Sequence, residues 1–335
     1  MGAVSKEQTT KNLGTNIAYF AINIAIGIFL TPYYIETLGI AAYAIIPLAT
    51  SLIGYIGILT NSLNSAVSRH LVIDLQRSDA KRANQTFNSA LFGITKIIVL
   101  LAPFVIIISF FAPTPFGVST EFAMDATWLF IGIGLAFLIR AWSSSFTVTL
   151  YASNRLDLIN FINLINIIVQ VASIIIIFTF SAPSLAGIGV SYLLSAVIAT
   201  LVSIYFYRLK HENLSIKYGD YDASRFREIA QMGGWMVINE VGSLLLINVD
   251  LIIVNYLFGN IVGGGYAISY QWVGLLRGMA GTFISILGPI IIIAYANKQR
   301  DRIIEYSKSA VKLTGIGIAL PIGLLCGFAP PSWSS

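Results

Sequence analysis

Charged residues are scarce in this sequence. Only 10% of its 335 residues are Asp, Glu, Lys or Arg, whereas 56% are hydrophobic. In a soluble domain about a quarter of the residues are charged, because its surface must face water. A chain this apolar cannot cover itself with polar groups. The composition therefore excludes a soluble globular fold and predicts an all-α bundle of membrane helices.

Cysteine and histidine are also rare. The single cysteine, Cys326, lies in an apolar run and excludes an internal disulfide or a Cys-rich metal site. His70 and His211 are far apart in the sequence, so no zinc or iron site is expected. The sequence also lacks a Gly-rich phosphate loop ending in Gly-Lys-Ser/Thr. We therefore expect no metal, no cofactor and no ATP-driven step, and we do not expect an enzyme.

Long apolar segments dominate the rest of the chain. A helix that crosses the hydrocarbon core of about 30 Å needs about 20 mostly apolar residues. The first segment lacks a signal-peptide cleavage site and should remain as a membrane anchor, with Pro32 near its end. Nine segments predict about nine transmembrane helices, at 12–34, 42–63, 86–111, 126–150, 158–180, 185–207, 229–258, 266–296 and 307–328.

Lysine and arginine are confined to one side of these predicted helices. With the N-terminus in the cytosol, 17 of the 20 lie in the N-terminal tail, the cytosolic loops or the adjoining turn of the last helix. The loops on the other side contain none, and the remaining three lie within helices. An excess of cations marks cytosolic loops, so the pattern predicts a cytosolic N-terminus. It also explains the net charge of +5 without a nucleic-acid partner.

Five ionisable residues interrupt the apolar segments: Lys96, Arg140, Glu240, Asp250 and Arg277. A charge at the bilayer centre costs roughly 2.5–3.5 kcal/mol, so each should face the protein interior or a wet cavity. Lys96 is expected about 15 Å from the cytosolic end of its helix, too deep to snorkel. The three cations are candidates for the path of an anionic substrate. The alternative is that they pair with acids inside the fold, for example Arg277 with Asp250.

Glu240 and Asp250 have a possible second role. A buried carboxylate with a raised pKa can carry a proton or bind Na⁺, so both are candidates for coupling transport to an ion gradient. Asp250 also shares a helix face with Asn239 and Ser243, because the spacing i, i+4, i+11 keeps the three within about 40°.

Asn12, Asn16 and Asn23 repeat this spacing in the first helix. Both stripes are candidate polar helix faces. The alternative is that each is only an interhelical hydrogen-bond face.

Several short motifs point to a family. They are Leu30–Tyr34 (LTPYY), Leu38-Gly39, Tyr43, Asn64–Ala66, Arg69, Asn154–Asp157 (NRLD), Val249–Leu251 (VDL) and Gly265–Ala267 (GYA). With these motifs the chain resembles the polysaccharide transporters of the MOP flippase superfamily, which include O-antigen and lipid-linked oligosaccharide flippases. The resemblance spans nearly the whole chain.

The resemblance implies two six-helix bundles that enclose a central cavity and open alternately to either side of the membrane. A weak internal repeat agrees, since Leu38-Gly39 and Tyr43 are echoed by Phe258-Gly259 and Tyr266. The expected domains are a six-helix bundle at 1–207, a cytosolic linker at 208–228 and an incomplete second bundle of three helices at 229–335. Family members normally continue for at least three more helices, so a C-terminal truncation is expected.

The implied function is to flip a polyprenyl-(pyro)phosphate-linked oligosaccharide to the outer leaflet of the plasma membrane in polysaccharide or O-antigen biosynthesis. The expected partners are the lipid bilayer, this substrate, H⁺ or Na⁺ if transport is ion-coupled, and glycosyltransferases of the same pathway. One alternative is a cation-coupled multidrug exporter of the same superfamily, whose cavity should be acidic or aromatic. Another is a truncated remnant that transports nothing. A glycosyltransferase or polymerase would need longer loops than these.

Overall fold

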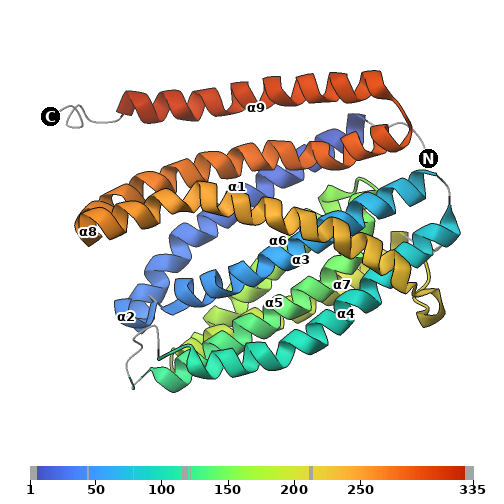
Figure 1. Ribbon diagram of the computed structural model, residues 1–335. Coiled ribbons are helices and arrows are strands. Elements are labelled where there is room, and N and C mark those ends of the chain that lie inside the picture. The colour runs from blue at the N-terminus through green and yellow to red at the C-terminus, as the bar shows by residue number, and fades with distance from the viewer. Residues whose placement is uncertain are drawn as a thin grey trace. The chain divides into compact units, whose positions relative to one another are not determined.

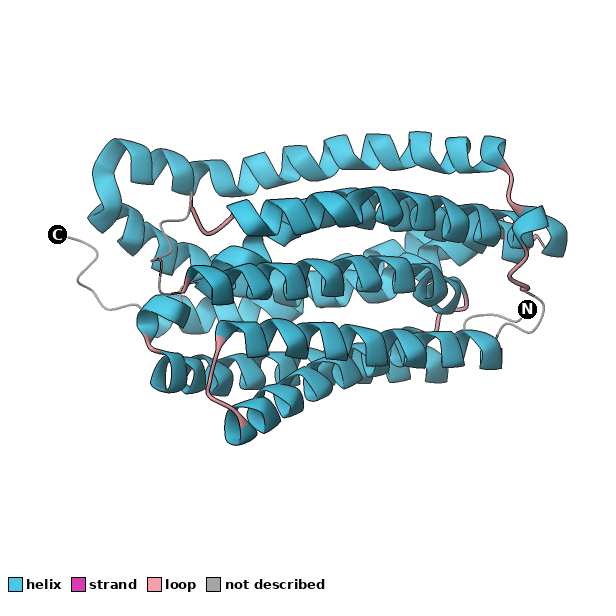
Figure 2. Ribbon diagram, turned by 90° about the horizontal axis from the view of Figure 1, so that it is seen from below, coloured by secondary structure: helices cyan, strands magenta, loops and turns pink. Residues whose placement is uncertain are grey.

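The computed structural model describes residues 6–328 except 44, 78, 115–119, 121 and 211–213, and it omits most side chains of 243–275. The described part is helical throughout, with short connections and no strand (Figure 2). The helices are α1 Lys6–Leu38, α2 Ile40–Tyr43, α3 Ile45–Gln76, α4 Ala80–Phe111, α5 Ala123–Ala152, α6 Leu156–Phe180, α7 Leu185–Lys210, the 3-10 turn η1 Tyr218–Asp220, α8 Ala223–Ala296 and α9 Arg300–Phe328.

The prediction of a helical membrane bundle is confirmed, and each predicted span falls on one of these helices. Within the described residues, α1, α4, α5, α6 and α7 are long and apolar enough to cross a membrane by themselves. The remaining predicted spans match α3, the two arms of α8 and α9 in position. The exact number of crossings stays a prediction.

Three helix boundaries differ from those predicted. Pro32 does not end α1, which continues to Leu38, because a membrane helix tolerates the lost hydrogen bond as a local distortion. The chain breaks instead at Gly39, whose φ of +81° lies in the left-handed region that favours glycine. The predicted cytosolic loop at 64–85 is mostly helix, since α3 runs to Gln76 and α4 starts at Ala80.

The third difference concerns α8. Its 74 residues are helical without a break, including the outer loop predicted at 259–265. A straight helix of this length would measure roughly 110 Å. Figure 1 shows instead that α8 runs out and turns back on itself, so two arms take the places of the predicted seventh and eighth helices.

The chain divides into two compact units. One is Gly14–Val237, and the other combines Met1–Leu13 with Ile238–Ser335. The first unit holds most of α1, the helices α2 to α7, the following linker and the first turns of α8. The division predicted from the family stays a prediction, but the linker at 208–228 lies wholly within the first unit.

Helix α5 is the centre of the first unit, where it packs against α3, α4, α6 and α7. Its crossing with α7 is very close, because a Cβ atom on Gly132 would lie 2.4 Å from the carbonyl oxygen of Gly189. Small residues at such crossings let two membrane helices approach closely enough for dense packing. Large apolar side chains fill the rest of this core, including Leu129, Phe130 and Ile188, all at most 1% exposed.

The outer surface of this unit is apolar as well. On α4, the side chains of Val99, Leu100, Ile107 and Phe111 are each more than half exposed. A soluble protein rarely exposes such a continuous apolar surface. These residues form an apolar outer face of the first unit, as a membrane position requires. The polar chemistry of the unit has to be sought inside the bundle and at the end that the charge pattern predicts to be cytosolic, which we call the cytosolic end.

Candidate substrate path and its cytosolic anchor

Polar side chains near the middle of α5 reach a different neighbouring helix at almost every position. Arg140 donates from Nη2 to Oδ1 of Asn163 on α6, at 2.7 Å. Trp142 contacts α4 and Ser143 contacts α7, where its hydroxyl lies 2.7 Å from that of Ser203. Ser144 donates to Asn64 on α3, at 2.8 Å. Successive helix residues point about 100° apart, so a central helix distributes its polar groups in this way.

Arg140 is the chemically distinctive member of this set. Its side chain is partly buried and donates a hydrogen bond to the neutral amide of Asn163. The other terminal nitrogen, Nη1, is buried and has no hydrogen-bond partner among the described residues. A buried guanidinium normally pairs with a carboxylate. No carboxylate of the described residues forms an ion pair with Arg140, so its charge is available to an anion.

A second unpaired group lies on the same helix as Asn163. Asn166 is one turn further along α6, and its Oδ1 atom is buried without a hydrogen-bond partner among the described residues. Residues three apart share a helix face, so Asn166 lies beside Asn163. One turn before them, Asn160 donates to Thr15 on α1, at 3.3 Å. The asparagines of α6 thus form a polar stripe that the sequence analysis missed.

This stripe has a recognisable signal in the sequence. Asn160, Asn163, Asn166 and Gln170 interrupt an otherwise apolar helix at spacings of three and four residues. That spacing is the helical period, so the four side chains share one face. Amides carry no charge, so these four side chains are less conspicuous in an apolar segment than an ionisable residue.

The predicted site residues are distributed over both units. Arg140 lies in the first unit, whereas the exposed side chains of Glu240, Asn239 and Arg277 belong to the second. The side chains of Ser243 and Asp250 lie outside the described residues. Pairing of Arg277 with Asp250 and ion coupling through Glu240 or Asp250 therefore stay predictions.

The predicted polar stripe on α1 has an uneven environment. Asn12 is buried and accepts a hydrogen bond from Gln8 at 2.9 Å. Asn16 is half-buried, and Asn23 is exposed. The local bond to Asn12 is of the kind expected for a structural role, and a shared function of the three asparagines stays a prediction.

Lys96 contacts an aromatic side chain of the linker. Its Nζ atom is 4.0 Å from the ring centre of Tyr221, in the linker between α7 and α8. Helix α4 starts six residues earlier than predicted, and the remaining 15 residues after Lys96 measure only about 22 Å. Lys96 therefore contacts a linker segment that carries charged residues, and both its depth in the membrane and its role in the substrate path stay predictions.

The linker is fixed to α4 by a ladder of hydrogen bonds. Asn84 and Asn88 accept from the backbone N–H groups of Ser215 and Lys217, both at 2.9 Å. Ser89 accepts from the backbone N–H of Asp222 at 3.0 Å. These side chains satisfy backbone groups that water would otherwise solvate. The linker is therefore part of the first unit and covers the cytosolic turns of α4.

An ion-pair cluster completes this attachment where α8 begins. Arg225 is 6% exposed, and its Nη2 lies 2.6 Å from a carboxylate oxygen of Asp74 on α3, itself 2% exposed. Thr86 on α4 donates to the same oxygen at 2.6 Å and accepts from Nε of Arg225 at 2.9 Å. Three helices thus meet at one buried pair, which we call the cytosolic anchor (Asp74, Thr86 and Arg225).

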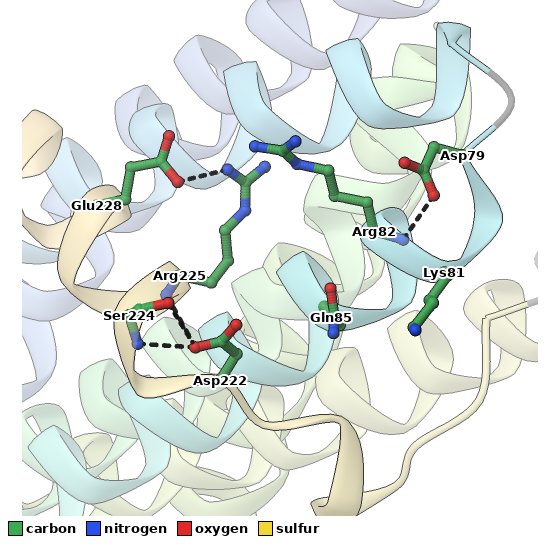
Figure 3. Close-up of a pocket in the computed structure, with 8 residues that line it drawn as sticks. All are labelled: Asp79, Lys81, Arg82, Gln85, Asp222, Ser224, Arg225 and Glu228. Carbon is green, nitrogen blue, oxygen red and sulfur yellow. Dashed lines mark hydrogen bonds and ion pairs between the residues drawn. The ribbon is translucent and has the colours of Figure 1, made fainter.

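Further charges surround the cytosolic anchor and line a hollow of about 340 Å³ (Figure 3). Nη1 of Arg225 donates to Glu228 at 2.6 Å, and this bond holds the pKa of the Glu228 carboxyl below its ordinary value. Asp222 caps α8, and the hydrogen bond from the Ser224 side chain lowers its pKa. Asp79 caps α4 by accepting from the N–H of Arg82. Each carboxylate of the hollow is therefore already engaged.

His70 lies beside the cytosolic anchor at the cytosolic end of α3. Its Nε2 atom is buried and has no hydrogen-bond partner among the described residues. Burial lowers the pKa of His70, and the positive charge of Arg225 lowers it further against the opposing effect of Glu228 and Asp74. The imidazole is therefore neutral at neutral pH.

The fold is that of a multi-pass membrane protein. Residues 9–293 match the family described as polysaccharide biosynthesis protein, and the chain belongs to that family. It is 28% identical over 322 residues to the membrane protein EpsK of Bacillus subtilis (strain 168), covering 96% of this chain. The chain spans 64% of the length of that relative.

Solved structures of the MOP superfamily share the fold. One is a MOP superfamily transporter from Pyrococcus furiosus, with a TM-score of 0.82 and 13% identity, over 97% of this chain and 72% of the other. Another is a multidrug resistance MATE family transporter in an outward-facing conformation, with a TM-score of 0.80 and 12% identity. The match covers 97% of this chain and 73% of the other. Together with the family match, this shared fold confirms the predicted superfamily, and the chain is a multi-pass protein of the plasma membrane.

Proposed function

We propose that the chain takes part in flipping a polyprenyl-(pyro)phosphate-linked oligosaccharide from the cytosolic to the outer leaflet. Membership of the polysaccharide biosynthesis family supports a transported saccharide. The observation that carries the proposal is Arg140, a buried cation in the membrane part of the bundle without a carboxylate partner among the described residues. A phosphate group would supply the acceptor that Nη1 lacks.

The neighbouring amides support the same type of substrate. The unpaired Oδ1 of Asn166 requires a hydrogen-bond donor, whereas the unpaired nitrogen of Arg140 requires an acceptor. A sugar phosphate carries both, as hydroxyl donors and phosphate oxygens. The two atoms are buried, so they become accessible only in a conformation that opens this part of the bundle. Such alternation is what a transporter of this superfamily requires.

Arg277 is the second cation that we assign to the path, and Glu240 and Asp250 are the groups that we assign to ion coupling. A dependence of transport on a pH or Na⁺ gradient, lost in Asp250→Asn or Glu240→Gln, would test the coupling. Glycosyltransferases that build the saccharide are the expected functional partners.

The test of the proposal is a flipping assay in proteoliposomes with a defined lipid-linked oligosaccharide. We expect Arg140→Gln to reduce flipping at least ten-fold, because removing one charge-assisted hydrogen bond costs about 1.5–3 kcal/mol. Arg140→Lys should retain part of the activity. The matched control is Arg208→Gln, since Arg208 is exposed at the cytosolic end of α7. Unchanged flipping in Arg140→Gln would show that this cation does not bind the substrate.

A cation-coupled exporter of small molecules is the second candidate, because several solved neighbours are MATE transporters. Their shared fold supports this candidate as well as the first. The unpaired positive charge of Arg140 argues against a cationic cargo, since like charges repel in a region of low dielectric. Export of a cationic dye that improves in Arg140→Gln, without flipping by the parent chain, would favour the exporter.

A further inference from the structure

Helix α4 carries an apolar groove on its exposed side, close to the linker. The groove has a volume of about 510 Å³ and is lined by Thr95, Lys96, Val99, Leu100, Pro103 and Phe104. Val99, Leu100 and Phe104 are 67%, 65% and 54% exposed, so the first unit leaves this face open. In a membrane, an open apolar face next to a cation is a surface where a lipid can lie.

Side-chain contacts hold the residues at the end of the groove nearest the linker in place. Trp142 on α5 donates to the hydroxyl of Thr95 at 3.0 Å, and Thr95 donates in turn to the carbonyl of Leu91. The ring of Tyr221 supports the Lys96 ammonium at 4.0 Å. Tyr221 stacks on Tyr218 at 6.1 Å. Lys96 is therefore held at the end of the groove by a packed aromatic pair.

The charge of Lys96 has no counter-ion in the described part of the chain. No carboxylate there lies within ion-pair distance of Nζ, and the contact with the Tyr221 ring leaves its N–H groups free to donate. Beside it, the side chains of Tyr218 and Ile216 are 66% and 47% exposed. An exposed aromatic ring and a lysine at the same level are typical of the membrane–water interface.

The dimensions of the groove agree with one leaflet. From Lys96 to Phe104 the helix rises about 12 Å over eight residue steps. One half of the hydrocarbon core is about 15 Å thick. A headgroup that meets Lys96 at the interface would therefore place an acyl chain along Val99, Leu100 and Phe104.

We propose that this groove is a binding site for an anionic phospholipid of the cytosolic leaflet. The lipid phosphate accepts hydrogen bonds from Nζ of Lys96, and one acyl chain covers the apolar face of α4. The site lies on the outside of the bundle and does not depend on the proposed flipping of a saccharide. A lipid bound in this groove would fix the linker and the cytosolic turns of α4 to the membrane surface.

Trp142 offers a direct measurement, because its indole donates to a residue of the groove. In a chain in which Trp128, Trp235, Trp272 and Trp333 are replaced by Phe, Trp142 is the single tryptophan emitter. This chain is reconstituted in vesicles that contain either brominated phosphatidylglycerol or brominated phosphatidylcholine, and the quenching of Trp142 is compared at equal bromine content. We expect the anionic lipid to associate about five-fold more strongly, the factor that corresponds to one basic residue near an anionic surface.

Matched variants assign the preference to Lys96. Lys96→Gln should abolish the preference for the anionic lipid, and Lys96→Arg should keep it. Lys217→Gln, an exposed lysine of the linker outside the groove, should leave it unchanged. Equal quenching by the two lipids, an unchanged preference in Lys96→Gln, or displacement of the brominated anionic lipid by stoichiometric polyprenyl phosphate would each overturn the proposal.

Discussion

At the scale of single residues, two arginines inside the first unit differ in their hydrogen-bond partners. Arg225 is buried with a carboxylate and a hydroxyl that fit it, whereas Arg140 is buried beside a neutral amide. A paired charge contributes to the structure, because removal of either partner leaves the other uncompensated. An unpaired charge costs free energy in the resting protein and lowers that cost by binding an anion. The two arginines thus separate a structural role from a functional one.

The cytosolic anchor leads to a stability prediction. Arg225→Gln should destabilise the protein by about 3–5 kcal/mol, because the buried carboxylate of Asp74 loses its partner. The double variant Arg225→Gln with Asp74→Asn should lose less than the sum of the two single changes. Unfolding midpoints in detergent measure the effect, with Arg227→Gln as the exposed control. Additive losses would mean that the pair is not coupled.

His70 predicts a pH dependence of stability. Its pKa is lowered in the folded protein, so below its ordinary value near 6.5 the unfolded chain binds a proton that the folded chain does not. Stability should therefore fall as the pH drops through about 6.5. Thermal midpoints at pH 7.5 and 5.5 should differ in the parent chain and differ less in His70→Gln. Glu228 and Asp222, whose pKa values are lowered, remain ionised over this range and do not contribute.

At the scale of helices, the dense crossing of α5 and α7 depends on glycine. Gly132→Ala would place a Cβ atom 2.4 Å from a backbone oxygen of Gly189, which cannot move without shifting the helix. We expect a loss of about 1–3 kcal/mol, the usual cost of overpacking a core.

The control for this prediction is Gly27→Ala on α1, where a new Cβ meets nothing within 4 Å. Since alanine favours a helix over glycine by up to about 1 kcal/mol, Gly27→Ala should be neutral or slightly stabilising. The same unfolding assay measures both variants. Equal effects of the two changes would show that the crossing is looser than the structure indicates.

The helices were predictable from the sequence because lipid imposes one simple requirement. Every spanning segment must be long, apolar and helical, and the segment at 185–207 therefore falls on α7 within a few residues. Loops lack such a requirement. The turn between α3 and α4 was overestimated, because the buried pair of Asp74 and Arg225 stabilises helical turns outside the membrane and joins residues 151 positions apart.

The site was only partly predictable, because the sequence shows which residues are charged but not which polar residues meet in the fold. Arg140 was identified because a charge in an apolar segment is conspicuous. Asn163 and Asn166 were not, since an amide in an apolar helix serves equally well for packing. The contact of Lys96 with Tyr221 was not predictable either, because the local sequence does not show where the linker packs against α4.

At the scale of the whole molecule, the positive charge and the fold together predict an orientation. The linker that carries Lys217 should lie in the cytosol, and the turn between α6 and α7, which contains Ser181, should lie outside. In a Cys326→Ser background, a membrane-impermeant maleimide should label Ser181→Cys in intact cells and Lys217→Cys only after permeabilisation. Both side chains are exposed, so access within the protein is equal. Labelling of Lys217→Cys in intact cells would reverse the orientation. It would also place the cytosolic anchor and the proposed lipid groove at the outer leaflet, where anionic phospholipids of the inner surface could not reach Lys96.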